Sequence, residues 1–339
     1  PASRVKVPAN AQRLDCAGLT ITAGFWNSHV HFTERKWADA GVIPAAELSR
    51  QLTEMLTRYG FTSVFDLGSQ WENTRKIRDR IEAGEVTGPR IRSVGQGLVP
   101  PGSLPNDTVV AMMGWMKPAV FEPADAAQAT AAAIKLLDSG VDGIKLFASG
   151  QRGVAMPQET MSAAVEEAHR RGKPVFVHPN SAADVWTAVR AGVDVIGHTT
   201  PASGPWDTML VAAMKERAVA LTPTLTIWKW YARHDRVSAQ DKTVETVTQQ
   251  LRAWVATGGT VLFGSDLGAI EYDPSEEYAL MSQAGMTFAQ ILASLTTAPA
   301  ARFGGVGKIA VGADADVVAF KDGPANVRYT IRGGRVVFQ

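Results

Sequence analysis

Residues 45–68 of the chain read AAELSRQLTEMLTRYGFTSVFDLG, and they contain the pattern that decides the fold. Residues 45–59 are amphipathic, which predicts a helix, and they end before Gly60, a residue type that commonly terminates helices. Residues 61–68 form a short apolar run, which predicts a buried strand. The order of helix, glycine and buried strand is typical of the units from which parallel sheets are built.

The same order recurs along the chain. Further predicted helices end at a glycine, and they cover residues 124–139, 158–171, 182–191 and 244–257. Short apolar runs predict eight strands at residues 24–32, 61–68, 90–98, 143–149, 174–180, 195–200, 220–227 and 261–268. Eight strands that alternate with helices predict an α/β fold, a (β/α)8 TIM-like barrel over residues 23–304.

The two ends of the chain have a different pattern. Residues 1–22 and 305–339 contain short β-type runs that are separated by turn sequences such as Asp-Gly-Pro and Gly-Gly. We expect these ends to form one small β-sandwich that both termini build together. Because residues 1–22 contain few strands, we expect the sandwich to be incomplete at its N-terminal side.

The composition is that of a globular protein with a large core. Hydrophobic residues make up 45% of the 339 residues, and the net charge is +1, with no basic surplus that would indicate nucleic-acid binding. One cysteine is too few for an internal disulfide or for a thiolate zinc or iron–sulfur site. No apolar run approaches the length of a membrane span, and residues 1–13 do not resemble a signal peptide. A cytoplasmic location is favoured, while a secreted or periplasmic one stays open.

Polar residues that can bind metals lie in or after the predicted strands. Residues two apart in a strand point to the same side, so His29 and His31 can face one point. His178, His198 and Asp266 each follow an apolar run in three further predicted strands. Functional groups of such barrels gather at the C-terminal ends of the strands. The sequence therefore predicts a metal site in the mouth of the barrel.

Lys145 lies within a predicted strand, between Ile144 and Leu146. A buried and unpaired ammonium group costs several kcal/mol or is driven to its neutral form. A neutral amine can react with CO2 to form a carbamate, which is a carboxylate on a long arm and can bridge two divalent metals. Alternatively, Lys145 points outward or pairs with an acidic residue such as Asp66.

These motifs make the sequence similar to the amidohydrolase superfamily over almost its full length. The matching elements are H-V-H at 29–31, I-K-L at 144–146, V-H at 177–178, G-H at 197–198, G-S-D at 264–266, and the C-terminal runs T-T-A-P-A-A-R-F-G and G-K-I-A-V-G-A-D-A-D-V-V-A-F. Within the superfamily, the chain most resembles the branch of imidazolonepropionase-like and prolidase-like enzymes. That branch includes Xaa-Pro dipeptidases and N-acyl-amino-acid carboxypeptidases.

The resemblance implies two divalent metal ions, each with its own ligands. The ligands of the first ion would be His29, His31 and Asp266, and those of the second would be His178 and His198. Zinc is the expected metal, although manganese, cobalt or iron could replace it.

The resemblance also implies the chemistry of the site. A carboxylated Lys145 would bridge the two ions, and a water between them would have a lowered pKa and supply hydroxide near neutral pH. Asp266 would accept the proton of this water and pass it to the leaving group. The expected reaction is hydrolysis of an amide bond in a small substrate such as a dipeptide or an N-acyl amino acid.

Substrate contacts are expected from two loops at the mouth of the barrel. Arg152 follows the fourth predicted strand, and Arg233 lies in the run W-K-W-Y-A-R-H at 228–234, which we expect to be a loop; either could bind a substrate carboxylate. Tyr231 in the same run would donate a hydrogen bond to the carbonyl oxygen as negative charge develops there. The apolar residues 109–120 could line a hydrophobic pocket.

Some neighbouring positions depart from the family pattern, among them Pro179-Asn180 after His178. These departures leave every predicted ligand in place and affect the expected substrate. Three alternatives stay open: the same site could hydrolyse a lactam, lactone, carbamate or phosphotriester, it could be a deaminase-like site with one metal and an unmodified Lys145, or the barrel could be a catalytically idle binding subunit. We expect a homo-oligomer that acts on a small molecule.

Overall fold

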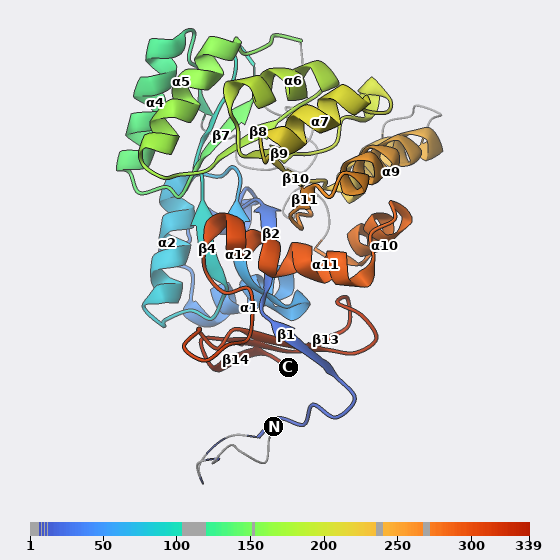
Figure 1. Ribbon diagram of the computed structural model, residues 1–339. Coiled ribbons are helices and arrows are strands. Elements are labelled where there is room, and N and C mark those ends of the chain that lie inside the picture. Colours follow the sequence, from blue (N-terminus) through green and yellow to red (C-terminus); the bar gives the residue numbers. More distant parts are fainter. Residues whose placement is uncertain are drawn as a thin grey trace.

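The structure of the protein is a computed structural model, and it describes residues 7, 9, 11, 13–103, 120–150, 153–234, 240–266 and 272–339 (Figure 1). For residues 234 and 240 it describes the backbone alone. Arg152 and residues 109–119 of the predicted apolar stretch lie outside the described residues. Helices and parallel strands alternate, so the predicted α/β class is confirmed.

The central strands are parallel and form two sheets, which have the orders β11-β10-β9-β8-β7-β5-β6 and β2-β3-β4. Their bounds are β2 Phe25–Val30, β3 Phe61–Asp66, β4 Arg90–Ser93, β5 Gly97–Leu98, β6 Val120–Phe121, β7 Ile144–Phe147, β8 Val175–His178, β9 Val195–Gly197, β10 Ala220–Thr222 and β11 Thr260–Val261.

Backbone hydrogen bonds connect the three-stranded sheet to the neighbouring segments on both of its sides. The N–H of Asp142, which precedes β7, donates to the carbonyl of Ser93 at the end of β4 (2.7 Å). On the other side, the N–H of Asp266, which follows β11, donates to the carbonyl of His29 in β2 (2.9 Å). The segments after β11 and before β7 are therefore both fixed against this sheet.

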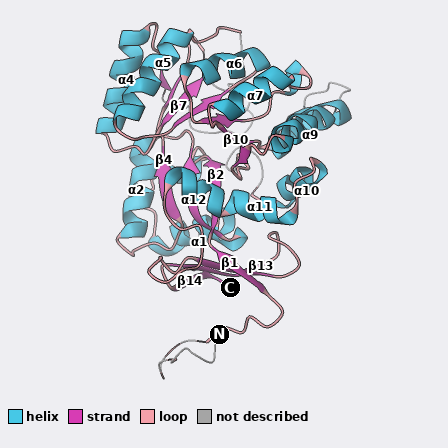
Figure 2. Ribbon diagram, viewed as in Figure 1, coloured by secondary structure: helices cyan, strands magenta, loops and turns pink. Residues whose placement is uncertain are grey.

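The helices lie outside the parallel strands, as Figure 2 shows. Their bounds are α1 Ala45–Met55, α2 Trp71–Glu82, α4 Ala126–Asp138, α5 Gln158–Arg170, α6 Ala182–Ala191, α7 Thr208–Glu216, α8 Leu225–His234, α9 Gln240–Ala256, α10 Ser275–Gln283, α11 Phe288–Leu295 and α12 Thr297–Phe303. In α6, Ser181 and Asp184 form a capping box, and Gly192 ends the helix in the left-handed conformation (φ 90°). The predicted bounds of this helix are confirmed.

An apolar cluster fills the space between the two parallel sheets. The ring centroids of Phe65 on β3 and Phe176 on β8 lie 4.6 Å apart. The ring of Phe303, at the end of α12, lies 5.1 Å from Phe65 and 5.6 Å from Phe176. Because strands of both sheets contribute to this cluster, the sheets share one apolar interior.

A separate antiparallel sheet is built from segments near both ends of the sequence. Its order is β1-β12-β13-β14, with β1 Thr20–Ala23, β12 Val317–Phe320, β13 Val327–Arg332 and β14 Arg335–Phe338. The described residues form this one sheet here, and a second sheet of the expected sandwich is not found among them. Arg90 on β4 pairs with Asp314 (2.7 Å) and with Asp316, which connects this sheet to the parallel strands.

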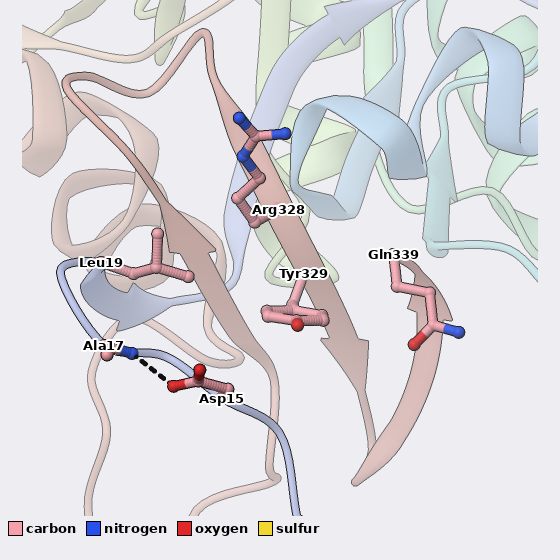
Figure 3. Close-up of a pocket in the computed structure, with 6 residues that line it drawn as sticks. All are labelled: Asp15, Ala17, Leu19, Arg328, Tyr329 and Gln339. Atoms are coloured by element: carbon pink, nitrogen blue, oxygen red, sulfur yellow. Dashed lines mark hydrogen bonds between the residues drawn. The ribbon is translucent and has the colours of Figure 1, made fainter.

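A pocket of about 460 Å³ opens on this terminal sheet, and Figure 3 shows the residues that line it. They are Asp15, Ala17, Leu19, Arg328, Tyr329 and Gln339. None of the residues predicted for the metal site is among them.

The structure corrects the prediction for residues 220–234. The predicted strand 220–227 ends at Thr222, and helix α8 begins at Leu225, so that the predicted loop 228–234 is helical. The run of threonine and isoleucine resembles a strand, but Pro223 has no N–H to donate to a sheet, and Thr224 turns the chain with φ 46°.

Two other predicted strands differ from the prediction in how they pair. The predicted strand 90–98 is divided into β4 and β5, which belong to different sheets. Of the predicted strand 261–268, Val261 belongs to β11 and the N–H of Leu262 still donates to Leu221 of β10, whereas Phe263 and Asp266 form backbone hydrogen bonds with β2; residues 267 and 268 lie outside the described residues.

Candidate metal centre

The four histidines that the sequence places in or after strands lie together in the structure. The ring centroid of His29 is 5.2 Å from that of His31 and 4.7 Å from that of His198. The rings of His178 and His198 are 4.4 Å apart. His29, His178 and His198 are buried, and His31 is partly buried. Three separate strands therefore bring four imidazoles to one place.

His29, His31 and Asp266 form a compact group of possible ligands. The Oδ1 atom of Asp266 lies 2.8 Å from Nε2 of His31 and 3.5 Å from Nε2 of His29. One ligand atom from each of the three residues lies within 4.8 Å of the others. In this arrangement one divalent ion can contact all three side chains with small adjustments.

Gly264 allows Asp266 to approach β2 this closely. A Cβ atom at residue 264 would lie 2.7 Å from the Cβ of His29, which is closer than two carbon atoms pack. Only glycine therefore fits at this position of the G-S-D motif.

Lys145 is buried beside these histidines. The side chain is 1% exposed, and its Nζ has no hydrogen-bonding partner among the described residues. The amine lies next to the imidazole of His29, because both pack against Gly197. A Cβ atom added to this glycine would lie 3.3 Å from Nζ of Lys145 and 3.3 Å from Cε1 of His29. Asp66 instead accepts hydrogen bonds from Ser69 and Ser93, so the described contacts do not support the outward or Asp66-paired alternatives for Lys145.

Burial sets the protonation of the buried groups. Burial lowers the pKa of Lys145 to about 8 and that of His178 to about 4, and it lowers the pKa values of His29 and His198 well below 6.5. For His31, burial lowers the pKa, but the attraction and hydrogen bond of Asp266 outweigh burial and raise it overall. Three imidazoles are therefore neutral at pH 7 and can offer a lone pair to a metal.

Hydrogen bonds determine which nitrogen of His31 and His198 is free. Nδ1 of His31 donates to the carbonyl of Gly68 (2.8 Å), which leaves Nε2 facing Asp266. Nδ1 of His198 lies 2.6 Å from Oγ1 of Thr224, and that hydroxyl donates its own proton to the carbonyl of Pro223 (2.9 Å). Nδ1 of His198 is therefore the donor, and Nε2 carries the lone pair.

His178 is oriented by Asn180, one of the positions that depart from the family pattern. Nε2 of His178 donates to Oδ1 of Asn180 (3.2 Å), and Nδ2 of Asn180 donates to the carbonyl of Ser149 (2.9 Å). The second bond fixes the orientation of the amide, so that Nδ1 of His178 keeps the lone pair. Asn180, although it departs from the family pattern, thus orients the imidazole of His178.

The backbone is strained at the same place. Among the described residues other than glycine, five have positive φ, and three of them are His198 (140°), Thr224 (46°) and Asp266 (57°). Such conformations are costly for residues with a side chain, and they persist where the surrounding structure enforces them. Strain of this kind is typical of functional sites.

Helix α8 lies beside the histidines and contributes aromatic side chains. The ring of Trp228 is 6.0 Å from the ring of His198 and 6.0 Å from that of Tyr231. Residues three apart share a face of a helix, so both rings belong to one aromatic surface. Burial and then the charge of Asp266 raise the pKa of Tyr231, so its phenol stays protonated and can donate. Trp228 is absent from the residues predicted from the sequence, because its position beside His198 depends on the helical state of this segment.

Other candidate residues lie away from this group or outside the described residues. Arg233 is exposed and lies 3.7 Å from Glu276, to which it forms an ion pair. The side chain of Arg152 is not described.

Comparisons with known proteins agree with this geometry. The model of the Amidohydrolase family matches residues 20–337, while among curated protein sequences none matches. A solved Xaa-Pro dipeptidase with bound methionine in the active site is 22% identical, with a TM-score of 0.80 over 98% of this chain and 90% of that one. A prolidase in complex with N-methylphosphonate-L-proline is 25% identical, with a TM-score of 0.77 over 99% and 90% of the two chains. The ochratoxinase of A. niger is 20% identical, with a TM-score of 0.74 over 93% and 82%.

Proposed function

This chain belongs to the amidohydrolase family, and from that premise we propose that it hydrolyses the amide bond of a small substrate, such as a dipeptide or an N-acyl amino acid. Membership of the family makes the protein a hydrolase of carbon–nitrogen bonds. None of the described helices has the length and apolar character needed to cross a membrane. The proposal concerns the substrate class, the metals and the role of each side chain.

The proposed scaffold is a single (β/α)8 barrel over residues 23–304, with residues 1–22 and 305–339 in a small β domain. The backbone bonds on both sides of the three-stranded sheet support closure of the barrel. The apolar cluster of Phe65, Phe176 and Phe303 also supports it, because rings from β3 and β8 meet in the interior.

The observation that carries the proposal is the buried Nζ of Lys145, which has no partner among the described residues. We infer that the neutral form of this amine, which its lowered pKa of about 8 makes accessible near neutral pH, is carboxylated. Its lone pair forms an N–C bond to CO2, one C=O π bond becomes a carboxylate C–O⁻, and the nitrogen releases one proton to solvent. The negative carbamate removes the cost of burying an ammonium group beside three neutral imidazoles.

The side chains fit two divalent ions, most simply zinc. His29, His31 and Asp266 would hold one ion, and the compactness of this group supports the assignment. His178 and His198 would hold the second ion through the nitrogens that their hydrogen bonds leave free. When bound, the ions supply a water of lowered pKa and polarise the scissile carbonyl.

Two residues of the chain are proposed to act directly on the substrate. Asp266 accepts a proton from the attacking water and transfers it to the leaving amine, because its carboxylate lies at the centre of the group. Tyr231 donates a hydrogen bond to the carbonyl oxygen, and its raised pKa supports a protonated phenol in this role.

The substrate class follows from the relatives and from helix α8. The named structural relatives include a Xaa-Pro dipeptidase and a prolidase. Trp228 and Tyr231 present an aromatic surface next to His198, which suits an apolar part of the substrate. Arg152 is proposed to bind a substrate carboxylate.

Metal analysis combined with a substrate panel tests the proposal. Protein that is purified without chelator is expected to contain about two equivalents of metal, and anomalous scattering with density beyond the Lys145 amine is expected at the histidines. The panel compares dipeptides and N-acyl amino acids with lactams, lactones, carbamates and phosphotriesters. Metal below about 0.2 equivalents together with no hydrolysis would support an idle barrel instead. Hydrolysis only of a non-amide bond would contradict the proposed substrate class.

A further inference from the structure

Glu277 on helix α10 is fully buried and lies outside the proposed ligands. Its Oε1 accepts a hydrogen bond from the N–H of Leu225 (2.9 Å). Its Oε2 accepts one from the N–H of Thr226 (2.8 Å) and one from the hydroxyl of the same residue (2.8 Å). The first N–H groups of a helix have no partner within that helix. Glu277 therefore caps the start of α8 from another helix. Burial raises the pKa of its carboxyl to about 7, while the three hydrogen bonds favour the ionised form, which suits the positive end of the helix dipole.

The capped residues directly follow Thr224, which touches the metal centre. Only Pro223 and Thr224 separate the last residue of β10 from the first residue of α8. Thr224 is β-branched and adopts φ 46°, a conformation that such residues rarely adopt. Its hydroxyl lies 2.6 Å from Nδ1 of His198. The three bonds to Glu277 fix the next residues of the chain, so they help to enforce the strained turn.

We propose that Glu277 is a positioning residue: by fixing the start of α8 it holds the Thr224 hydroxyl against Nδ1 of His198 and so sets the orientation and tautomer of this imidazole. The inference rests on the proposed function, because it treats His198 as a metal ligand. The same contact fixes the direction in which α8 leaves β10, and with it the aromatic surface of Trp228 and Tyr231.

The test variant is Glu277→Gln, with Glu167→Gln as the matched control. Glutamine keeps one acceptor oxygen, but its amide nitrogen cannot accept, so at least one N–H at the start of α8 loses its partner. Glu167 on α5 is also a buried glutamate, and it pairs with Arg170 at the end of that helix and with Arg171 (2.7 Å) directly after it, rather than with α8. Both variants are expected to lose thermal stability. Only the change at residue 277 is expected to alter the metal centre.

Two readouts separate positioning from a purely structural role. Chelator competition with Zn²⁺ is expected to show one of the two ions bound about 10–100-fold more weakly in Glu277→Gln, with the other ion unchanged. In the metal-free protein, ¹⁵N NMR of labelled histidines is expected to show that His198 loses its single Nδ1–H tautomer. Thr224→Val is expected to produce the same two changes, and the double variant is expected to add little to either one.

The outcomes distinguish this inference from the proposed function. Wild-type metal affinity and an unchanged His198 tautomer in Glu277→Gln would overturn the inference while the proposed function stands. Absence of metal binding by the wild-type protein would contradict the proposed function, and the tautomer measurement would still decide the role of Glu277. If Glu277→Gln does not fold, Glu277→Asp, which keeps the charge and shortens the side chain, is measured by the same criteria. Equal effects in Glu167→Gln would also overturn the inference.

Discussion

The two proposed ligand groups differ in what holds them in place. In the first group, the supports are mainly backbone atoms, since the N–H of Asp266 bonds to the carbonyl of His29 (2.9 Å) and Nδ1 of His31 bonds to the carbonyl of Gly68 (2.8 Å), and one side chain, that of Asn27, accepts from the N–H of His29 (3.2 Å). In the second group, the supports are side chains, since His178 is held by Asn180 and His198 by Thr224. A backbone support tolerates almost any side chain at its position, whereas a side-chain support is lost by one substitution. The second group is therefore the one that neighbouring substitutions can tune.

Lys145→Ala is expected to affect both ligand groups equally, because the proposed carbamate would bridge the two ions. Loss of the bridging carboxylate removes metal from both, and turnover falls by about a thousandfold or more. Metal analysis and amide hydrolysis measure these effects, and added short carboxylates are expected to restore part of the activity. Full metal occupancy in this variant would argue against a bridging carbamate.

Asp266→Asn affects only the first group. Asparagine keeps an oxygen that can bind metal but cannot accept the proton, so kcat is expected to fall by about 100-fold or more, while the melting temperature stays close to that of the wild type. Steady-state kinetics and a thermal melt check both parts. Wild-type turnover would refute the role of this residue as the base.

Asn180→Ala tests whether side-chain supports matter in the second group. Removal of the amide frees Nε2 of His178, and one metal is expected to bind about 10–100-fold more weakly. Asn180→Asp, which retains an acceptor for this imidazole, is the control and is expected to bind metal more tightly than the alanine variant. Chelator competition gives both affinities, and equal affinities in wild type and Asn180→Ala would remove the proposed contrast.

The smallest expected effect is a pH dependence of the rate at which metal-free protein is reconstituted, and it comes from the titration of Lys145 alone. Because burial lowers the pKa of this amine to about 8, the neutral and reactive fraction grows as pH rises toward that value and levels off above it. At a fixed concentration of dissolved CO2, reconstitution of metal-free protein is expected to accelerate about tenfold per pH unit well below pH 8. A rate that does not change with pH between 6 and 8 would contradict carboxylation as the limiting step.

The sequence predicts best those features that depend on local pattern. The glycine at 192 and the cap at Ser181 fix the bounds of α6 through neighbouring residues, so the predicted helix 182–191 is confirmed. That the four histidines and Asp266 lie together was also predictable, because they lie at or after the ends of apolar runs that reach the same edge of the parallel strands.

Features that depend on distant partners could not be predicted in this way. Glu277 contacts residues about fifty positions earlier in the chain, and the helical state of 225–234 depends on that contact and on the strained turn at Thr224. A local reading extends the strand through the β-branched residues up to Ile227, and it therefore predicts a loop where helix α8 carries Trp228 and Tyr231. The terminal sheet likewise depends on pairing between segments near the two ends of the sequence.

The pairing of β1 with β12 has a consequence for biosynthesis. Thr20 lies opposite Phe320, so a ribosome has translated some three hundred further codons before the earliest strand meets its neighbour. His29 and His31 lie in and just after β2, so they are translated early. Asp266 is translated more than two hundred residues later. The nascent polypeptide therefore lacks one residue of its proposed first ion-binding group until Asp266 has been translated, so the proposed loading with metal would come late in synthesis.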